Sequence, residues 1–421
     1  MLNHLDSQRS GNSFDVILKV AERCNLACPY CYYFFQEYDG NKNPPLMSEE
    51  VMKELPNFLR RSLDQLNLSR LNIVLHGGEP LLMKPARVDR LLSSLTAELG
   101  ARAEIAFAVQ TNGVLINDEW ISLFEKHQVK VGVSIDGHKH THDRLRPDHS
   151  GAGSYDDTIR GWGMLKSAFN AGRLKRVGAL CVVHATTDED SRTLLGHLVN
   201  TLGIASPNLN FPRGGRDSVD AIIWNKASDK HRHMVKSFTA NLIEPKFHYV
   251  RGIADVLLAL YSDRGAERND RRSSFRHHIA TISSAGDLNV DDNLMGIDAS
   301  LSDSGLTIFG TSLKDLVLGS VWQRLNTAVD TIPAECSGCP WFRSCRSGDL
   351  YNRFSRRDGF AGKTVLCDTI KMIHEEVADF LVERKVVKLK ELATRLDEAP
   401  VVSAADTFSS LMLKPELGEA A

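Results

Sequence analysis

The sequence predicts an α/β protein: a partial (β/α)6 barrel of the TIM type, followed by a helical bridge and a small C-terminal cysteine-rich domain. Short β-branched runs alternate with amphipathic stretches through the first half of the 421-residue chain. This alternation is typical of βαβ units around a parallel sheet. The units number six, fewer than the eight of a closed barrel, so the barrel should be open. Seven of the eight cysteines fall into two groups.

Six β-strands are expected, each a short run of β-branched and apolar residues. They are DVILKV (15–20), LNIVLH (71–76), EIAFAVQ (104–110), VKVGVSID (129–136), VGALCVVH (177–184) and PNLNFP (207–212). Helical patterns between them cover residues 49–65, 86–99, 118–127, 155–170 and 187–202. Ser48 precedes two glutamates and should cap the first of these helices. The crossovers should be right-handed.

The second half of the chain is less regular. Taking residues 14–215 as the barrel, we expect a mostly helical bridge over 216–275 and a small cysteine-rich domain over 276–375. A single helix is expected over 372–396, so residues 376–421 should comprise a C-terminal helix and a disordered tail after Pro400.

Composition excludes several classes of protein. Hydrophobic residues make up 42% of the chain and charged residues 25%, which are ordinary values for a globular protein. The net charge of −2 favours neither nucleic acid nor a membrane surface as partner. No apolar run reaches the roughly 18 residues of a spanning helix, and the polar N-terminus is not a signal peptide. We expect a cytoplasmic protein, in which clustered cysteines indicate metal or redox chemistry rather than disulfides.

The first cysteine group is CNLACPYC, with Cys24, Cys28 and Cys31. The same spacing could mark one buried helical face, but Pro29 would break that helix. A loop after the first strand is therefore expected, where parallel barrels carry their active sites. A zinc site would need a fourth ligand, and the nearest candidate, His76, follows a different strand. An iron–sulfur cluster on three thiolates would leave one iron open to a small molecule.

Three further motifs stand at the ends of expected strands: HGGEP (76–80), QTNG (110–113) and SIDG (134–137). Paired glycines in the first let a ligand approach the backbone, and its glutamate can receive an ammonium group. Ser134 and Asp136 in the third could bind sugar hydroxyls. Each motif alone is an ordinary turn, but their succession predicts one ligand site.

The cysteine spacing and these motifs, in this order over residues 14–215, resemble the radical S-adenosylmethionine (SAM) enzymes. The resemblance implies that Cys24, Cys28 and Cys31 hold a [4Fe–4S] cluster. The amino and carboxylate groups of SAM would chelate its open iron. Reductive cleavage of SAM would then release a 5′-deoxyadenosyl radical that abstracts an unactivated hydrogen.

The resemblance also implies contacts to SAM. Tyr30 would lie by the adenine, the strip Gly77, Gly78 and Glu79 would meet the methionine amino group, and Ser134 and Asp136 would lie on the ribose side. The segment HKHTHDRLR (138–146) matches a loop of the family that ends in a His-Asp pair and a basic residue. Arg146 is then expected to contact a carboxylate of cofactor or substrate, and a zinc site on these histidines is not expected.

The second cysteine group comprises Cys336, Cys339, Cys345 and Cys367, a full set of four thiols. On spacing alone, structural zinc and iron–sulfur both remain open. Downstream of a radical SAM barrel the group resembles a SPASM domain, which carries auxiliary [4Fe–4S] clusters. Two cysteine positions of that pattern hold Asp349 and Asp291, and no upstream cysteine pair exists, so one auxiliary cluster is expected. Its expected role is that of an electron relay or a structural centre.

Asp292 aligns with an aspartate that serves as base in the sulfatase-maturing relatives. Oxidative bond formation releases a proton, so a base at this point is chemically sensible. Asp292 could instead be a turn residue of the hairpin SAGDLNVDD (284–292).

The resemblance points to a peptide maturase of the cyclophane-forming type, acting on a ribosomally made precursor and reduced by a flavodoxin or ferredoxin. An anaerobic sulfatase maturase, which forms formylglycine from Cys or Ser, is the alternative. A zinc-stapled scaffold with an inactive barrel is a third class, against which the intact first cysteine group argues. Residues 1–14 are too few for a fused leader-binding domain, so precursor recognition is expected from the barrel, the bridge or a separate protein.

Overall fold

The computed structural model describes residues 13–34, 39–183, 191–205, 207–211, 214–226, 253–274 and 278–398, together with residues 232, 235, 236 and 239. The strands are β1 (Ser13–Ala21), β2 (Arg70–Gly77), β3 (Glu104–Thr111), β4 (Lys130–Ser134), β5 (Val177–Val182), β6 (Asn208–Asn210), β7 (Ile279–Ile282), β8 (Asp287–Asn289) and β9 (Leu306–Thr307). The main helices of the first half are α1 (Glu49–Gln65), α2 (Pro85–Leu99), α3 (Asp118–Lys126), α4 (Lys139–Leu145), α5 (Tyr155–Asn170) and α6 (Ser191–Leu195). Those of the second half are α7 (Val219–Lys226), α9 (Ile253–Tyr261), α10 (Asp263–Ser274), α11 (Asp292–Met295), α12 (Leu313–Leu318), α13 (Ser320–Asp330), α14 (Phe342–Cys345), α15 (Leu350–Arg353), α16 (Cys367–Glu383) and α17 (Leu389–Asp397).

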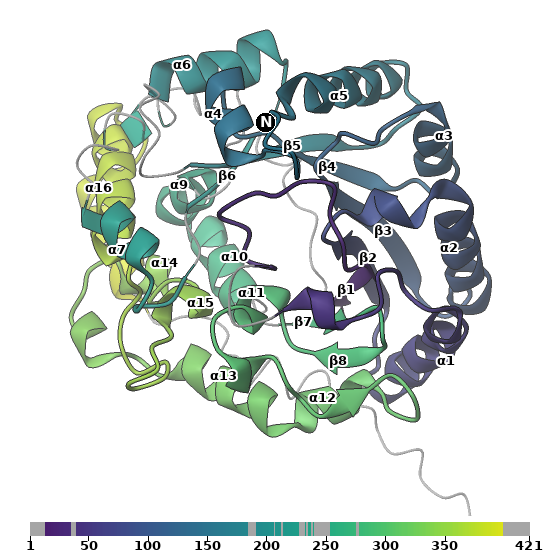
Figure 1. Cartoon of the computed structure of the whole chain (residues 1–421). Helices are drawn as coiled ribbons and strands as arrows, with labels where there is room; N and C mark the ends of the chain where they lie inside the picture. Colours follow the sequence, from purple (N-terminus) through teal and green to yellow (C-terminus); the bar gives the residue numbers. More distant parts are fainter. Residues whose placement is uncertain are drawn as a thin grey trace, which may run out of the picture.

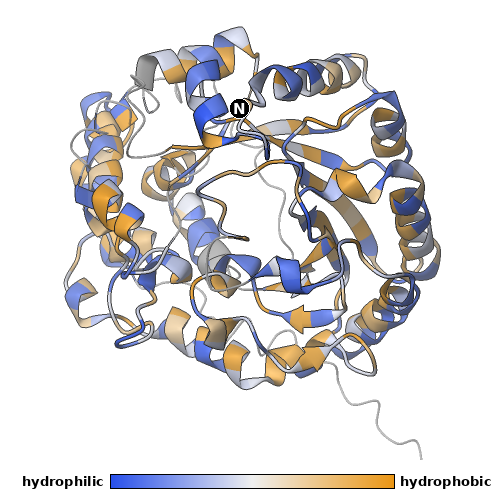
Figure 2. Ribbon diagram, in the orientation of Figure 1, coloured by the Kyte–Doolittle hydropathy of each residue, from blue (hydrophilic) through white to orange (hydrophobic). Residues whose placement is uncertain are grey.

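All of these strands form one sheet in the order β6-β5-β4-β3-β2-β1-β7-β8-β9. Strands β1 to β6 pair in parallel, so each expected strand is present in the expected open barrel. Figure 1 shows α1, α2, α3 and α5 on the outer side of these strands, with the loop after β1 crossing the middle of the ring. The helices carry hydrophilic and hydrophobic residues side by side (Figure 2), as expected for helices that cover a sheet on one face only.

Strand β1 lies in the interior of the sheet, between β2 and β7, and its sequence suits that place. Phe14, Val16, Leu18 and Val20 alternate along it and are fully buried. The helix that follows begins where expected: the Ser48 side chain accepts a hydrogen bond from the Val51 amide at 3.2 Å.

The sheet continues beyond the six expected strands. Strand β7 pairs in parallel with β1, and β8 and β9 add in antiparallel order. The expected hairpin over 284–292 is therefore part of the barrel sheet, with its turn at Gly286, whose φ is +93°. This arrangement brings Asp292, just after β8, into contact with Lys19 of β1 and with Tyr32 of the loop that follows β1.

Two local expectations were wrong. The single helix over 372–396 is two helices, α16 and α17, because Lys385 adopts a left-handed conformation (φ +56°) and the Val386 amide turns back to the Leu381 carbonyl at 2.9 Å. The segment 138–146, expected as a loop, contains the short helix α4.

Parts of three expectations lie outside the described residues. These are the tail after Pro400, much of the bridge, and the first residues of the helix expected over 187–202, of which α6 is the described start. No helix in the described part of the chain has the length and apolar character needed to cross a membrane.

Candidate active site at the carboxyl ends of the strands

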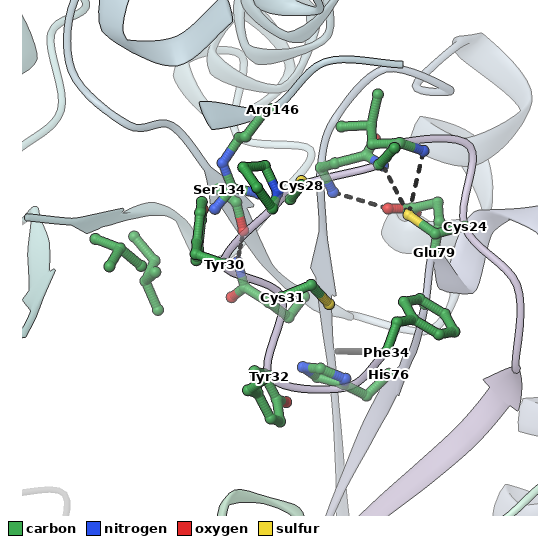
Figure 3. Close-up of a pocket in the computed structure, with 18 of the residues that line it drawn as sticks. Cys24, Cys28, Tyr30, Cys31, Tyr32, Phe34, His76, Glu79, Ser134 and Arg146 are labelled. Atoms are coloured by element: carbon green, nitrogen blue, oxygen red, sulfur yellow. Dashed lines mark hydrogen bonds between the residues drawn. The ribbon is translucent and has the colours of Figure 1, made fainter. Parts of the chain in front are cut away.

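A cavity of about 660 Å³ opens at the carboxyl ends of the parallel strands. Its lining includes Cys24, Cys28, Tyr30, Cys31, Tyr32, Phe34, His76, Gly78, Glu79, Asn112, Ser134, Arg146, His149, Asn210, Phe211 and Asp220. In Figure 3, Cys24 lies by Glu79 on one side, while Tyr30 lies by Ser134 and Arg146 on the other. The fold thus gathers most of the residues that the motifs singled out. Gly77, Asp136 and Asp292 are close by but do not line the cavity.

The cysteine loop is held by a neighbouring turn that sequence reasoning missed. The Ala27 amide donates to the Pro147 carbonyl at 2.8 Å, and His149 Nε2 lies 2.9 Å from the Cys24 carbonyl oxygen. The Leu26 amide points at Cys24 Sγ, 3.4 Å away. The signal for this clamp was the sequence PDHSG directly after Arg146, a run of turn-forming residues.

Burial disfavours the ionised form of two thiols of this loop, those of Cys24 and Cys28. The eight cysteines, all of which lie in the described ranges, form no disulfide. Burial, with the nearby Glu79 charge, raises the pKa of Cys24 to about 12. Burial also raises the pKa of Cys28 to about 11, although Arg146 opposes this. Ionised thiolates here require compensation by a metal centre.

The donor set of this loop suits an iron–sulfur cluster. Thiolates are the ligands that hold such clusters, and Cys24, Cys28 and Cys31 line one cavity from one loop. Three thiolates would leave one iron of a four-iron cluster open to a ligand in the cavity. As the side chains lie, no three His, Cys, Asp or Glu residues in the described part of the chain form a group that could hold one metal ion.

The two glycines of HGGEP are required by the chain itself. A Cβ on Gly77 would lie 1.9 Å from the Ala21 carbonyl oxygen, and one on Gly78 would lie 2.3 Å from that of Arg23. The Gly78 and Glu79 amides donate to these same carbonyls at 2.8 and 2.9 Å. The close approach that the sequence suggested for a ligand is made here by the start of the cysteine loop.

Glu79 is a buried carboxylate on the wall of the cavity. It is 1% exposed and accepts hydrogen bonds from the Leu81 amide (3.1 Å), Thr111 Oγ1 (2.7 Å) and the Asn112 amide (2.8 Å). Burial raises its pKa to about 7 in spite of these donors. No Lys or Arg in the described ranges forms an ion pair with it. Its position on the cavity wall suits a ligand that brings an ammonium group.

Asp136 organises the opposite wall rather than facing the cavity. It accepts from the Tyr30 hydroxyl, from Arg146 Nε at 2.8 Å and from the Val182 amide at 2.9 Å. Burial opposes its ionisation, but these partners outweigh burial and hold its pKa below the ordinary value. The Arg146 guanidinium lies 5.5 Å from the centre of the Tyr30 ring. Ser134 does face the cavity, and its Oγ accepts from Gln110 Nε2 at 3.0 Å.

The histidine segment packs against this wall. His142 is buried, and its Nδ1 accepts from the Asp136 amide at 3.2 Å while its Nε2 lies 3.3 Å from Ser154 Oγ. Burial lowers the pKa of His142 to about 4, so it is neutral at physiological pH. Its role in the described structure is to support Asp136.

Asp292 lies behind the cavity in a polar cluster. It is 3% exposed, and its Oδ2 accepts from Lys19 Nζ at 2.6 Å and from the Tyr32 hydroxyl at 2.7 Å. Tyr32 and His76 line the cavity in front of it. The turn role considered for Asp292 belongs instead to Asp291, whose side chain caps α11 through the Asn293 amide at 3.0 Å.

Sequence reasoning missed Lys19, Tyr32 and His76 as a unit. Lys19 is the one charged residue inside the apolar run VILKV, and it is 1% exposed. His76 Nδ1 accepts from the Gly77 amide at 2.9 Å and lies 3.3 Å from Lys19 Nζ, so a neutral His76 carries its proton on Nε2. A lysine in a buried strand was the available signal.

The second cysteine group lies in the C-terminal region, around α14 and the start of α16. Its four thiols are half-buried. Burial raises the pKa of Cys367, an effect that Lys363 and Lys371 oppose and that Asp368 and Cys336 reinforce. Cys336 and Cys345, as thiolates, would favour the charged form of the Arg353 guanidinium. Four thiols are the full ligand set of a metal–thiolate centre.

Comparison with known proteins agrees with this geometry. Residues 18–196 match the Radical SAM superfamily. The serine-type anaerobic sulfatase-maturating enzyme of Klebsiella aerogenes is 33% identical over 160 residues, which are 37% of this chain and 38% of that protein. The match therefore spans less than half the length of that relative.

Two solved structures share the fold. Native anSMEcpe with bound AdoMet and Kp18Cys peptide superposes with a TM-score of 0.70 at 18% identity, covering 88% of this chain and 99% of that one. Streptococcus suis SuiB bound to precursor peptide SuiA gives a TM-score of 0.55 at 14% identity, covering 85% of this chain and 76% of that one. Residues 18–196 are therefore a radical SAM domain, in a chain related to the anaerobic sulfatase-maturating enzymes.

Proposed function

We propose that the protein is a radical SAM peptide maturase that oxidatively modifies a side chain of a ribosomally made precursor, by a cyclophane-type carbon–carbon crosslink. The observation that carries the proposal is the cavity of about 660 Å³, which the thiols of Cys24, Cys28 and Cys31 and the buried carboxylate of Glu79 line together. This size is ordinary for a site that encloses a small molecule.

Cys24, Cys28 and Cys31 would hold a [4Fe–4S] cluster, and Glu79 would receive the ammonium group of SAM. When bound, cluster and SAM supply the 5′-deoxyadenosyl radical that abstracts a substrate hydrogen. Tyr30 offers an aromatic face on the wall opposite Glu79 (Figure 3), and Arg146 and Asp136 hold it in place. The chain's contribution is to orient the cofactor and to exclude water.

The cavity also has a wall that the motifs leave unassigned. It is lined by Asn210 and Phe211 at the end of β6 and by Ser218 and Asp220 at the start of α7. We assign this wall to the substrate side chain. On the cysteine-loop side, Tyr32 connects the cavity to Asp292, which would take the proton released by the oxidation, as a base behind Tyr32 rather than in direct contact with substrate.

A peptide substrate is supported by the fold relatives, since anSMEcpe and SuiB have both been solved with peptides. Cys336, Cys339, Cys345 and Cys367 would hold one auxiliary [4Fe–4S] cluster that relays electrons, with a flavodoxin or ferredoxin as donor. We propose the same division of the chain as the sequence predicts: a barrel over 14–215, a bridge, a cysteine-rich domain and a C-terminal part.

Formation of formylglycine from Cys or Ser is the second candidate. The sulfatase-maturating relatives and the position of Asp292 beside the cavity favour it as much as crosslinking.

The test is an anaerobic assay of the reconstituted protein with dithionite and SAM. Two kinds of peptide are tested as substrates: the Kp18Cys peptide, and aromatic-rich peptides encoded beside the gene. Loss of two hydrogens retained in a macrocycle supports crosslinking, whereas an aldehyde on Kp18Cys supports the second candidate. A colourless protein that holds zinc and no iron would reject both. The Cys24, Cys28 and Cys31 triple alanine variant should release no 5′-deoxyadenosine.

A further inference from the structure

Arg353 differs from the other buried arginines. Four arginines of the described residues are buried: Arg146, Arg343, Arg353 and Arg395. Arg146 pairs with Asp136, Arg343 with Asp270 and Glu398, and Arg395 with Asp263. Arg353, the most buried at 1% exposed, has no carboxylate partner among the described residues.

The Arg353 guanidinium has hydrogen-bond acceptors, but no described carboxylate balances its charge. The guanidinium donates to the carbonyls of Ala328 (2.7 Å), Phe360 (2.8 Å), Thr331 (3.3 Å) and Gly362 (3.4 Å), all of them neutral. A buried charge is costly unless an opposite charge accompanies it. Burial lowers the pKa of Arg353 accordingly.

The thiols of the C-terminal group can supply the counter-charge. The carbonyls that Arg353 binds flank the cysteines, because Thr331 precedes Cys336 and Phe360 precedes Cys367. As thiolates, Cys336 and Cys345 would oppose the effect of burial on the pKa of Arg353. The neighbouring Arg216, whose Nε donates to the Arg353 carbonyl at 2.8 Å, is already paired with Asp358. Arg353 is thus a buried cation placed next to two of the four C-terminal thiols.

We infer that Arg353 is the internal counter-ion of an anionic iron–sulfur centre on Cys336, Cys339, Cys345 and Cys367, and that it raises the reduction potential of that centre. The inference rests on the proposed function for the identity of the centre. Four thiolates outweigh the positive charge of the iron–sulfur core, so the centre is an anion even when oxidised. Reduction by one electron adds a negative charge, moves no proton, and is favoured by a fixed cation nearby.

Arg353 is therefore a positioning and tuning residue, not a catalytic one. Its position ties α13, through Ala328, to the loop that carries Phe360 and Gly362 between the third and fourth cysteines. A purely structural role, in which Arg353 only joins α13 to this loop, would account for the same hydrogen bonds. A test must therefore separate the effect of the Arg353 charge from the effect of its hydrogen bonds.

The experiment compares Arg353→Met and Arg353→Lys with the parent, in the full chain carrying Cys24, Cys28 and Cys31 all replaced by alanine, so that only the C-terminal centre remains. Each protein is reconstituted anaerobically, its iron is measured, and the centre is titrated with dithionite while electron paramagnetic resonance follows the reduced form. Arg61→Met is the control for the loss of an arginine elsewhere, because Arg61 also donates to two carbonyls, those of Thr311 and Ile308, but lies on α1, is part-buried and pairs with Glu54.

The expected result is a shift of the Arg353→Met midpoint to more negative potential, with Arg353→Lys close to the parent and Arg61→Met unchanged. Iron loss from Arg353→Met but not from Arg353→Lys also supports the inference. Equal midpoints at equal iron content, or equal iron loss from both Arg353 variants, would overturn it, as would a redox-silent centre holding zinc. If the midpoint depends on Arg353 but the protein with Cys24, Cys28 and Cys31 intact modifies no peptide, the proposed function is rejected and the inference stands.

Discussion

Replacing Lys19 by methionine should destabilise the protein by about 3–5 kcal/mol, the usual cost of removing one partner of a buried ion pair. Lys19 Nζ lies 2.6 Å from Asp292 Oδ2, and the two side chains are 1% and 3% exposed. At that separation two unit charges attract by about 6 kcal/mol if the effective dielectric constant is about 20. Desolvation offsets much of this in the intact pair. The variant keeps the desolvation of the Asp292 carboxylate and loses the attraction.

The assay is urea unfolding of the metal-free chain under anaerobic conditions, for Lys19→Met, Asp292→Asn and the double variant. Because the double variant leaves no unpaired charge, it should cost less than the sum of the two single changes, by at least about 2 kcal/mol of coupling. The m-value should stay constant, so that midpoint shifts report stability. Lys130→Met is the control: Lys130 lies on β4, burial and the nearby Arg70 and Arg176 lower its pKa, and its loss should be neutral or slightly stabilising. Additive single changes, or a Lys19→Met cost below about 0.5 kcal/mol, would refute the pairing argument.

Three further changes test the cavity. Gly77→Ala places a Cβ 1.9 Å from the Ala21 carbonyl oxygen at a φ of +141°, so it should displace the cysteine loop and lower the iron bound after reconstitution; iron bound at the parent level would contradict this. Glu79→Gln should flatten the pH dependence of stability. Because burial raises the pKa of Glu79 from 4.5 to about 7, the metal-free parent should lose about 3 kcal/mol as pH rises through that window, and an unchanged slope in the variant would exclude Glu79 as the cause. Tyr32→Phe removes the hydroxyl that donates to Asp292, so 5′-deoxyadenosine release should continue while modified peptide falls by about tenfold to a hundredfold; an unchanged ratio of the two products would remove Tyr32 from the proton path.

Local pattern was enough to predict the first six strands and the start of α1. Apolar runs bounded by turn residues and a serine before two glutamates are signals that tertiary contacts reinforce rather than override. Strand β7 was harder to predict from the sequence, because a run of only four residues, IATI, shows little hydrophobic periodicity. Its place beside β1 depends on a pairing between segments more than 250 residues apart, which no local signal encodes. The break between α16 and α17 was equally hidden, since the amphipathic pattern continues through Lys385.

Some residues of the candidate site could likewise be placed from local motifs, and others could not. The cysteine loop, Glu79 and Ser134 could be placed from motifs, because each stands at the end of a parallel strand and such ends share one edge of the sheet. The reason for Gly77 could not be foreseen, because it depends on the Ala21 carbonyl of the adjacent strand. The position of Asp292 behind Tyr32 depends on β7, the strand that the pattern did not reveal. Lys19 was visible in the sequence as a charge in an apolar run, but only its partner explains it.

Buried charge links the two cysteine groups. Lys19 and Asp292 satisfy each other, so they need nothing from outside the chain. Glu79 and Arg353 are buried ions of opposite sign with no oppositely charged side chain bonded to them in the described structure, and each lies beside a different set of thiols. A chain that kept both without a ligand would bear two desolvation costs for no gain. A cation that enters the cavity would offset the desolvation cost of Glu79, and an anionic centre on the C-terminal thiols would offset that of Arg353. An ammonium-bearing cofactor has the charge that the first site needs, and a metal–thiolate centre has the charge that the second site needs. A barrel that served only as a scaffold would need neither buried charge.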